Sequence, residues 1–392
     1  MDKIKQLDVT SDYQSIFELS EFAFQYKLNP DDLENKKEEA MRHIIWGHMD
    51  DKQIAAKLHL IPLSVYINGK EMKMGGVSSV ATWPEYRRQG LVKELLHHSL
   101  TYMKRQGHTV SYLYPFSFGY YRKYGWELAF GKKEYSIPIE RFSNTKSSPS
   151  QGYVRRENAD VSLLNTLYAT YAKKFNGMLA RDEKWWHDRI LNNKDMHVAI
   201  AYNENDEASG YILFNVKKDV FHVMDHAYTS QVGRELLLQF ISNHDSMVEK
   251  VKMTVPENDH LPLLLNEPRF EQQTEPYFMA RIVDVQAFLK QFPFQEGNEK
   301  ITLHVTDDFL PENTGVYQLN AYGKHTDVTY LNGTDASRRG LHCSIQKLTA
   351  MCLGYIQPTE LFEMGIVEGD KQDAVSLEKI IPKQQPYFAD FF

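Results

Sequence analysis

The segment with the clearest chemical potential is a short basic loop that joins an expected strand to an expected helix. It reads WPEYRRQG over residues 83–90. The first amides of an α-helix have no acceptor within the helix, and the helix dipole favours negative charge beside them. Gly90 allows a phosphate to approach the backbone closely, and Arg87, Arg88 and Lys93 add positive charge. The pattern indicates a diphosphate site, but taken alone it is more typical of an ordinary strand–loop–helix unit with a surface arginine pair.

A second candidate for chemistry is Tyr121, which begins the segment YRKYGW over residues 121–126. A phenol with a pKa near 10 stays protonated at neutral pH, so it can act as a proton donor. Taken alone, Tyr121 is consistent with a packed aromatic residue beside Tyr120 and Tyr124. Within this turn we favour a role as general acid.

Hydrophobic periodicity places both candidates in a mixed α/β layer. Residues 15–24 and 33–46 have helical spacing, and Asn68-Gly69 predicts a hairpin turn between strands. An amphipathic helix from Leu91 ends before Gly107. Strands are expected at 54–61, 64–67, 71–74, 76–82, 109–114 and 126–130.

The rest of the chain predicts two further regions. Residues 143–152 are polar and rich in breakers, which favours a linker. Beyond them, helices are expected at 161–174 and 233–243, and strands at 197–202, 210–216, 251–255 and 277–283, without a counterpart of the Arg87-to-Gly90 loop. From about Phe294 the pattern changes to strands at 301–305 and 315–319, a helix at 344–353 and an aromatic C-terminus.

Composition excludes several classes of protein. The 392 residues carry a net charge of -7, which offers no general attraction for nucleic acid, so no nucleic-acid partner is expected. Two cysteines and 15 histidines without ligand spacing predict no metal site and a reducing, cytoplasmic location. The chain shows neither a signal peptide nor an apolar run of about 20 residues, so no membrane association is expected.

The two motifs together resemble those of the GNAT acetyltransferases. Residues 87–92 are similar to the pattern Arg/Gln-x-x-Gly-x-Gly/Ala, with Val92 standing where Gly or Ala is usual. Residues 121–126 are similar to the pattern Tyr-x-x-x-Gly-aromatic. The Arg-Arg-x-Gly-Leu form, the length and the aromatic C-terminus resemble one subgroup, the Eis (enhanced intracellular survival) aminoglycoside acetyltransferases.

This resemblance implies an α/β fold with mixed sheets and tandem GNAT-like domains. The implied domains are a catalytic one at 1–145, a degenerate second one at 146–290 and a sterol-carrier-protein-like one at 291–392. It also implies a homohexamer.

The resemblance further implies that acetyl-CoA is the co-substrate. The backbone of Val80, Ala81 and Thr82 should bind the pantetheine arm, and Phe116 and Ser117 should lie beside it. The α-carboxylate of Phe392 should act as general base, with a frayed tail as the alternative. The pyrophosphate should be wrapped by Arg88, Gln89, Gly90, Leu91, Val92 and Lys93.

The expected reaction is acetyl transfer to amines of small cationic acceptors such as aminoglycosides. Protein lysines and polyamines remain alternative acceptors, and a lipid- or acyl-CoA-binding carrier or sensor remains an alternative outside enzymology. Trp185 and Trp186, with Asp182, Glu183 and Asp188, offer a cationic pocket, but we favour a helix with one buried tryptophan and solvated charges.

Overall fold

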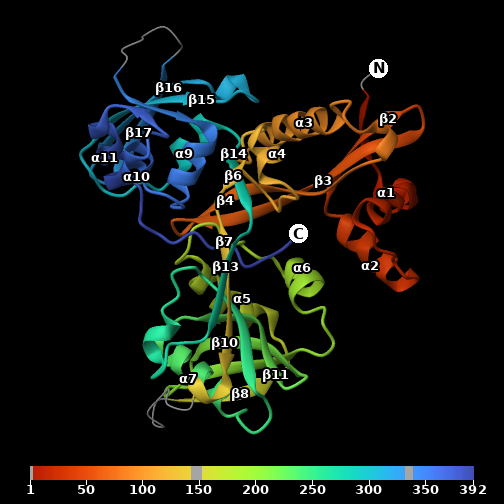
Figure 1. Cartoon of the computed structure of the whole chain (residues 1–392), viewed down its shortest axis with the longest axis vertical. Helices are drawn as coiled ribbons and strands as arrows, with labels where there is room; N and C mark the ends of the chain where they lie inside the picture. Colours follow the sequence, from red (N-terminus) through yellow and green to blue (C-terminus); the bar gives the residue numbers. More distant parts are fainter. Residues whose placement is uncertain (1–2, 143–151, 332–338) are drawn as a thin grey trace.

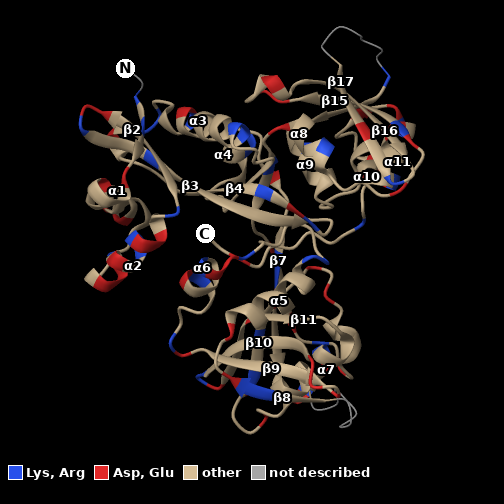
Figure 2. Ribbon diagram, turned by 180° about the vertical axis from the view of Figure 1, so that it is seen from behind, with Lys and Arg blue, Asp and Glu red and all other residues tan. Residues whose placement is uncertain are grey.

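The structure is a computed structural model that describes residues 3–142, 152–331 and 339–392. These residues form three lobes that meet around the C-terminal segment (Figure 1). Acidic and basic residues are interspersed over all three lobes (Figure 2). None of the described helices is both long and apolar enough to cross a membrane. The linker expected at 143–152 lies outside the described residues except for Gly152.

The first lobe is built on a sheet that, within the described residues, has seven strands in the order β1-β2-β3-β4-β5-β14-β6. Leu95, Leu96 and Met103 of α3 pack on one core of this sheet, whereas α1 contributes Ile16 and Leu19 to a separate core. The elements are β1 (Ile4–Leu7), α1 (Val9–Phe24), α2 (Pro30–Ala40), β2 (Ile44–Asp50), β3 (Gln53–Ile67), β4 (Lys70–Thr82), α3 (Leu91–Arg105), β5 (Val110–Leu113), α4 (Phe118–Arg122), β6 (Glu127–Leu128) and β14 (Met279–Ile282).

Local sequence signals predict the turn between β3 and β4 correctly but misplace the end of α2. The expected turn joins β3 to β4, with positive φ angles of 48° at Asn68 and 76° at Gly69, as a two-residue hairpin requires. The helix predicted at 33–46 is wrong at its end, because α2 stops at Ala40 and residues 44–50 form β2. Pairing with residues 53–60 of β3 makes this segment a strand, which periodicity over a short apolar run cannot predict.

The second lobe repeats the sheet-and-helix plan. In the described chain its sheet also has seven strands, in the order β13-β7-β12-β11-β10-β9-β8. The elements are β7 (Gly131–Pro138), β8 (Gly152–Glu157), α5 (Val161–Ala172), α6 (Glu183–Trp185), the π-helical turn η3 (Trp186–Ile190), β9 (His197–Asn203), β10 (Ala208–Lys217), β11 (Val220–Tyr228), α7 (Gln231–Ser242), β12 (Lys250–Val255) and β13 (Glu271–Pro276).

The two large sheets exchange strands. β7 follows the first lobe in the chain but pairs with β12 and β13 of the second sheet. β14, expected as part of the second domain, instead lies between β5 and β6 of the first sheet. The sheets therefore do not divide at one position of the chain. The segment between β5 and β6, which carries Tyr121, has to cross over β14.

The third lobe has, among its described residues, five strands in the order β17-β16-β15-β18-β19. Its core is continuous with that of the first lobe, because Leu303 and Leu348 belong to the same buried cluster as Val65 and Phe278. The elements are α8 (Val285–Gln291), β15 (Lys300–Thr306), β16 (Gly315–Tyr322), β17 (His325–Leu331), β18 (Leu341–Ser344), α9 (Ile345–Cys352), α10 (Pro358–Glu363), β19 (Glu368–Gly369) and α11 (Lys371–Ile380).

Candidate active site

The strands β4 and β5 diverge within the first sheet. Their parallel pairing ends at Val77 and Leu113, whereas β4 continues to Thr82. Beyond Val77, β4 stays paired with β3, and its other edge has no neighbouring strand in the described structure. The Thr82 hydroxyl is buried and lacks a partner among the described residues. Since buried polar groups need partners, an extended ligand with amide groups fits beside Val80, Ala81 and Thr82.

A β-bulge lies at the start of this free edge. Lys57 pairs with Ala81 and His59 with Ser78, so two residues of β4 oppose a single residue of β3. Ser79 has a φ of 50°, which a residue other than glycine adopts only when its surroundings hold it there. Lys57 Nζ donates to the Ser79 carbonyl at 3.2 Å and to the Ser79 hydroxyl at 2.8 Å. These bonds hold the bulge in shape.

The basic loop has the form that a phosphate ligand requires. Arg87, Arg88, Gln89 and Gly90 are all exposed. Gly90 is the N-cap of α3 at a φ of 84°, and no side chain caps the first amides of this helix. A Cβ added to Gly90 would meet nothing within 4 Å, so the approach to these amides is open. The residues present therefore fit a diphosphate at the start of α3.

The other residues that we predict to bind the pyrophosphate differ in whether the backbone amide or the side chain faces the ligand site. The Leu91 side chain is buried in the core under α3, which leaves its amide for a ligand. The Gln89 side chain donates to the Glu85 carbonyl at 3.1 Å. Lys93 is exposed and, with Gly90, lines a groove of about 1040 Å³ along α3. Val92 is partly buried in the same core as Leu91.

We expect Arg88→Gln to raise the KM for acetyl-CoA about tenfold, because one charge-assisted bond to a phosphate contributes about 1.5–3 kcal/mol. The kcat should change less than about twofold, since the contact is remote from the transferred group. Initial rates over a range of acetyl-CoA concentrations measure both constants. Arg156→Gln, an exposed arginine of β8, is the matched control. A fall in kcat at unchanged KM would contradict the assignment.

The turn that carries Tyr121 comes after β5 in the chain and begins with the short helix α4. Ser117 is the N-cap of α4, where its hydroxyl accepts a bond from the Tyr120 amide at 3.4 Å. Tyr121 is only 3% exposed. Burial, and to a smaller extent Tyr124, raises the pKa of the Tyr121 phenol above its ordinary value. The phenol therefore stays protonated at neutral pH and can act as a proton donor.

The glycine of this turn is required for two reasons. Gly125 has a φ of 90°, and an added Cβ would lie 2.0 Å from Nη1 of Arg281. Arg281, on β14, donates to the Tyr124 carbonyl and pairs with Asp307 of the third lobe. The tyrosine turn is thus fixed by a buried arginine and by a carboxylate from a different lobe.

A cavity of about 460 Å³ opens where the β4 bulge, the tyrosine turn, α1 and α2 meet the C-terminal residues. Glu39 is the only carboxylate side chain in its described lining, and it pairs with Arg189 and with Lys36. The lining includes Phe17, Phe24, Tyr26, His43, His59, Ser79, Val80, Phe116, Tyr121, Phe391 and Phe392.

The C-terminal segment is held by hydrogen bonds on the way to this cavity. The Tyr387 amide donates to the Asn176 carbonyl, and the Asn176 amide donates to the Gln385 carbonyl, both at 2.9 Å. The buried Asp390 carboxylate accepts from Arg181 Nε at 3.0 Å and from Trp185 Nε1 at 2.8 Å. These contacts exclude a frayed tail.

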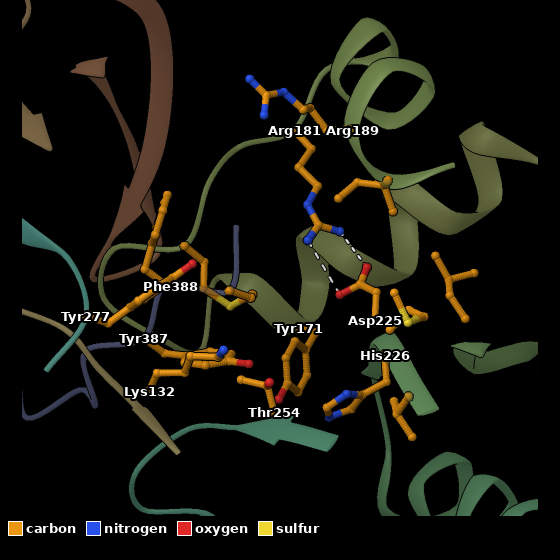
Figure 3. Close-up of a pocket in the computed structure, with 16 residues that line it drawn as sticks. Lys132, Tyr171, Arg181, Arg189, Asp225, His226, Thr254, Tyr277, Tyr387 and Phe388 are labelled. Atoms are coloured by element: carbon orange, nitrogen blue, oxygen red, sulfur yellow. Dashed lines mark hydrogen bonds and ion pairs between the residues drawn. The ribbon is translucent and has the colours of Figure 1, made fainter. Parts of the chain in front are cut away.

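Arg181 is the central group of this anchor. Figure 3 shows its guanidinium turned toward Asp225, to which Nη1 donates at 2.6 Å. It also lies 3.9 Å above the Tyr168 ring. One buried cation thus joins β11 to the C-terminal segment.

Aromatic packing places the last residue in the cavity wall. The Phe392 ring lies 5.1 Å from that of Phe278 between centroids, and Phe388 lies 4.7 Å from the same ring. A Cβ on Gly76 of β4 would approach the Phe392 ring to 2.8 Å. Phe392 therefore packs directly against the strand whose free edge the site uses.

The structure brings some of the predicted site residues together and separates others. Val80, Phe116, Tyr121 and Phe392 line one cavity, whereas Ser117 serves as a helix cap. Gly90 and Lys93 line the neighbouring groove along α3.

The tryptophan pair does not form an exposed cationic pocket. Trp185 and Trp186 are both buried, and Trp186 Nε1 donates to Asn165. The segment is helical, as we favour, but both tryptophans are buried rather than one. Asp182 pairs with Arg42.

Sequence reasoning missed the basic residues His43, His59 and Arg189, which line the cavity, and Lys57, which lies behind His59. Of these, only Lys57 carried a signal. It interrupts the apolar strand IAAKLHLI of residues 54–61, and a fully buried lysine is rare without a partner. His59 lies in the same strand, whereas His43 and Arg189 come from segments without a motif.

Among its described residues, the second lobe has no equivalent open helix end. α7 occupies the position of α3, between parallel strands β11 and β12. Its N-cap Ser230 accepts from the Gly233 amide at 3.1 Å, and a Cβ on Gly233 would lie 2.2 Å from the Ser209 carbonyl. The amides that would bind a phosphate are thus capped and closely packed, which supports a single cofactor site in the first lobe.

Comparisons with known proteins agree with this architecture. Family models described as an acetyltransferase (GNAT) domain match residues 3–129 and 177–282, and a sterol carrier protein domain matches residues 285–389. An uncharacterised N-acetyltransferase of Streptomyces avermitilis is 22% identical over 88% of each chain.

Solved structures cover almost the whole molecule. A probable N-acyltransferase of Enterococcus faecalis is 27% identical, with a TM-score of 0.91 over 99% of each chain. Eis1 of Mycobacterium abscessus shares the fold at 18% identity, with a TM-score of 0.83 over 99% of this chain and 100% of its own. The chain therefore contains two acetyltransferase (GNAT) domains followed by a sterol carrier protein domain.

Proposed function

We propose that the protein transfers the acetyl group of acetyl-CoA to a primary amine of a small acceptor molecule. In this proposal Tyr121 is the general acid and the α-carboxylate of Phe392 is the general base. The observation that carries it is the single cavity that Tyr121 and Phe392 line together with the β4 bulge. A proton donor and the chain end thus meet where β4 offers free peptide groups.

The residues present fit acetyl-CoA in two places. The free edge of β4 at Val80, Ala81 and Thr82 suits the amide groups of a pantetheine arm, and the open start of α3 with Arg88 suits the diphosphate. When bound, the co-substrate supplies an activated acyl group as a thioester. Tyr121 then holds the proton that the leaving sulfur needs.

The anchored C-terminal segment, and not a sequence motif, positions the proposed general base. Asp390 is fixed by Arg181 and Trp185 only two residues before the chain ends. This fixation limits the position of the Phe392 carboxylate, so it can hold an incoming ammonium and accept its proton directly or through water. A flexible terminus would lose that advantage through the entropy of ordering it.

The acceptor is proposed to be a small ammonium compound. Phe17, Phe24 and Tyr26 supply aromatic rings that attract cations. Because Glu39 is already paired with Arg189 and Lys36, the α-carboxylate remains as the anionic group for the ammonium. Aminoglycosides are the first acceptors to test, and lysine-like amines and polyamines are the alternatives.

A thiol-release assay with a kanamycin-type amine, a lysine-type amine and a polyamine tests the proposal. We expect Tyr121→Phe to lower kcat about 100-fold, because general acid catalysis contributes about that much, and to leave acetyl-CoA affinity unchanged. Tyr120→Phe, a partly buried neighbour, is the matched control and should keep most activity. If the wild-type protein binds acetyl-CoA but releases no thiol with any acceptor, a sensor or carrier is the better explanation.

A further inference from the structure

A lysine is buried beneath the candidate active site without an acidic partner among the described residues. Lys57 is 0% exposed. Its Nζ atom contacts the Ser79 carbonyl at 3.2 Å, the Ser79 hydroxyl at 2.8 Å and His59 Nε2 at 3.1 Å. The nitrogen of an amine has three positions for hydrogen bonds besides its bond to carbon, and these three partners occupy all of them. A neutral amine would donate twice and accept once, and an ammonium would donate three times.

Two histidines connect this lysine to the cavity. His59 Nδ1 lies 3.2 Å from His43 Nδ1, and His59, His43 and Ser79 all line the cavity with Tyr121. Because His43 uses Nδ1 for this contact, its Nε2 remains as the nitrogen for a molecule in the cavity. The contacts therefore form an unbroken path from the cavity to Lys57.

Among the three groups of the path, Lys57 has the highest pKa and therefore holds a transferred proton most readily. Burial, and after it the charges of Arg189, Arg42, Lys36 and Lys57, lowers the pKa of His43 to about 3. Burial also holds the pKa of His59 well below its ordinary value and lowers the pKa of Lys57 to about 7.

Other groups face the path from the surrounding elements. The Ser20 hydroxyl of α1 lies 3.3 Å from that of Ser79, and Glu39 of α2 is already paired with Arg189. Tyr26, Tyr121 and the end of the chain at Phe392 complete the cavity wall. None of these described side chains is a free carboxylate that would hold the Lys57 proton permanently.

The reaction requires more than one proton acceptor. An ammonium acceptor loses two protons from nitrogen when it becomes an amide. The proposed α-carboxylate accounts for the first, which converts the ammonium to an amine. The second leaves while the nitrogen–acyl bond forms, and the protonated phenol of Tyr121 cannot accept it.

We propose that His43, His59 and Lys57 form a proton-accepting chain that takes the second proton from the acceptor nitrogen. This inference rests on the proposed acetyl transfer. The acceptor N–H bond breaks and its proton passes to His43 Nε2. The Nδ1 proton of His43 passes to His59 Nδ1, and the Nε2 proton of His59 passes to neutral Lys57. His43 is the catalytic residue, and His59 and Lys57 act through it.

The transfer leaves a consistent arrangement. After the transfer the Lys57 ammonium can donate to His59 Nε2 and to both oxygens of Ser79, so no new contact has to form. Release of the proton to water through the same path restores the neutral amine.

The test uses the full chain and an O-alkyl hydroxylamine as acceptor, because this weakly basic amine stays neutral at neutral pH and loses only the second proton. For the wild type, kcat/KM should fall as the pH drops through about 7, where Lys57 becomes protonated. Lys57→Met and His43→Gln should each lower kcat/KM about 100-fold at neutral pH and remove this pH dependence.

Controls separate the chain from a structural role. His108→Gln replaces a buried histidine that lines a different pocket, and it should keep the wild-type pH profile. Acetyl-CoA affinity, measured by calorimetry, reports on folding. If Lys57→Met does not bind acetyl-CoA, that variant is not correctly folded. The rate and pH profile of His43→Gln then test the proton chain alone.

Two outcomes are distinct. Variants that bind acetyl-CoA and retain the wild-type rate and pH profile would overturn the proton chain. A wild-type protein that acetylates no amine at all would overturn the proposed function first.

Discussion

Blocking the charge of the C-terminal carboxylate is expected to lower kcat about 1,000-fold, the middle of the range for one proton-transfer group. The sharpest change is a C-terminal amide of Phe392, introduced by ligation of a synthetic tail peptide. It fills nearly the same space but cannot accept the ammonium proton. Thiol release measures turnover, and calorimetry should show unchanged acetyl-CoA affinity.

A simpler variant adds a few residues after Phe392. Phe392 is 6% exposed and Asp390 is fixed, so the added residues must enter the cavity or displace the tail. The same residues added at the N-terminus are the matched control. Full turnover by the amide or the extended protein would remove the carboxylate from the mechanism.

Replacing Arg181 by methionine is expected to lower the free energy of unfolding by about 3–5 kcal/mol, because removing one partner leaves buried charges uncompensated. Arg181 pairs with Asp225 and Asp390, and its side chain is 1% exposed. Burial already raises the pKa of Asp390 above its ordinary value, so the loss of the cation favours its neutral form further. Urea unfolding followed by tryptophan fluorescence measures the change.

The matched control is Arg269→Met. Arg269 pairs with Glu267 at the surface, with 89% of its side chain exposed, and its replacement should leave the unfolding midpoint unchanged. If Arg181→Met unfolds at the same urea concentration as the control, the anchor does not stabilise the tail. A stable variant with full acetyl transfer would also show that the position of the tail tolerates loss of the anchor.

Sequence patterns were sufficient wherever a property depends on neighbours in the chain. The Asn68-Gly69 turn, the basic loop before α3 and the tyrosine turn are local, and each appears in the structure where it was expected. The combination of a loop, a helix start and a tyrosine turn in one order also pointed to the GNAT fold. Such signals act through φ preferences and helix ends, which involve only a few consecutive residues.

Contacts between distant segments decided the rest. Residues 44–46 became a strand through pairing with β3, and β7 and β14 exchanged sheets because hydrogen-bond partners are chosen in space. The reason that residue 125 has to be glycine is found in Arg281, which is remote in sequence. No local pattern encodes such pairings, because they depend on which surfaces meet after folding.

The candidate chemistry shows the same division. Tyr121 could be assigned from its turn, since the motif and the turn occupy the same few residues. The path from His43 through His59 to Lys57 could not, because it joins β3 to the turn between α2 and β2 only after the sheet forms, and burial then changes the acidity of each group. Side-chain type is a property of the chain, whereas proton affinity is a property of the folded environment.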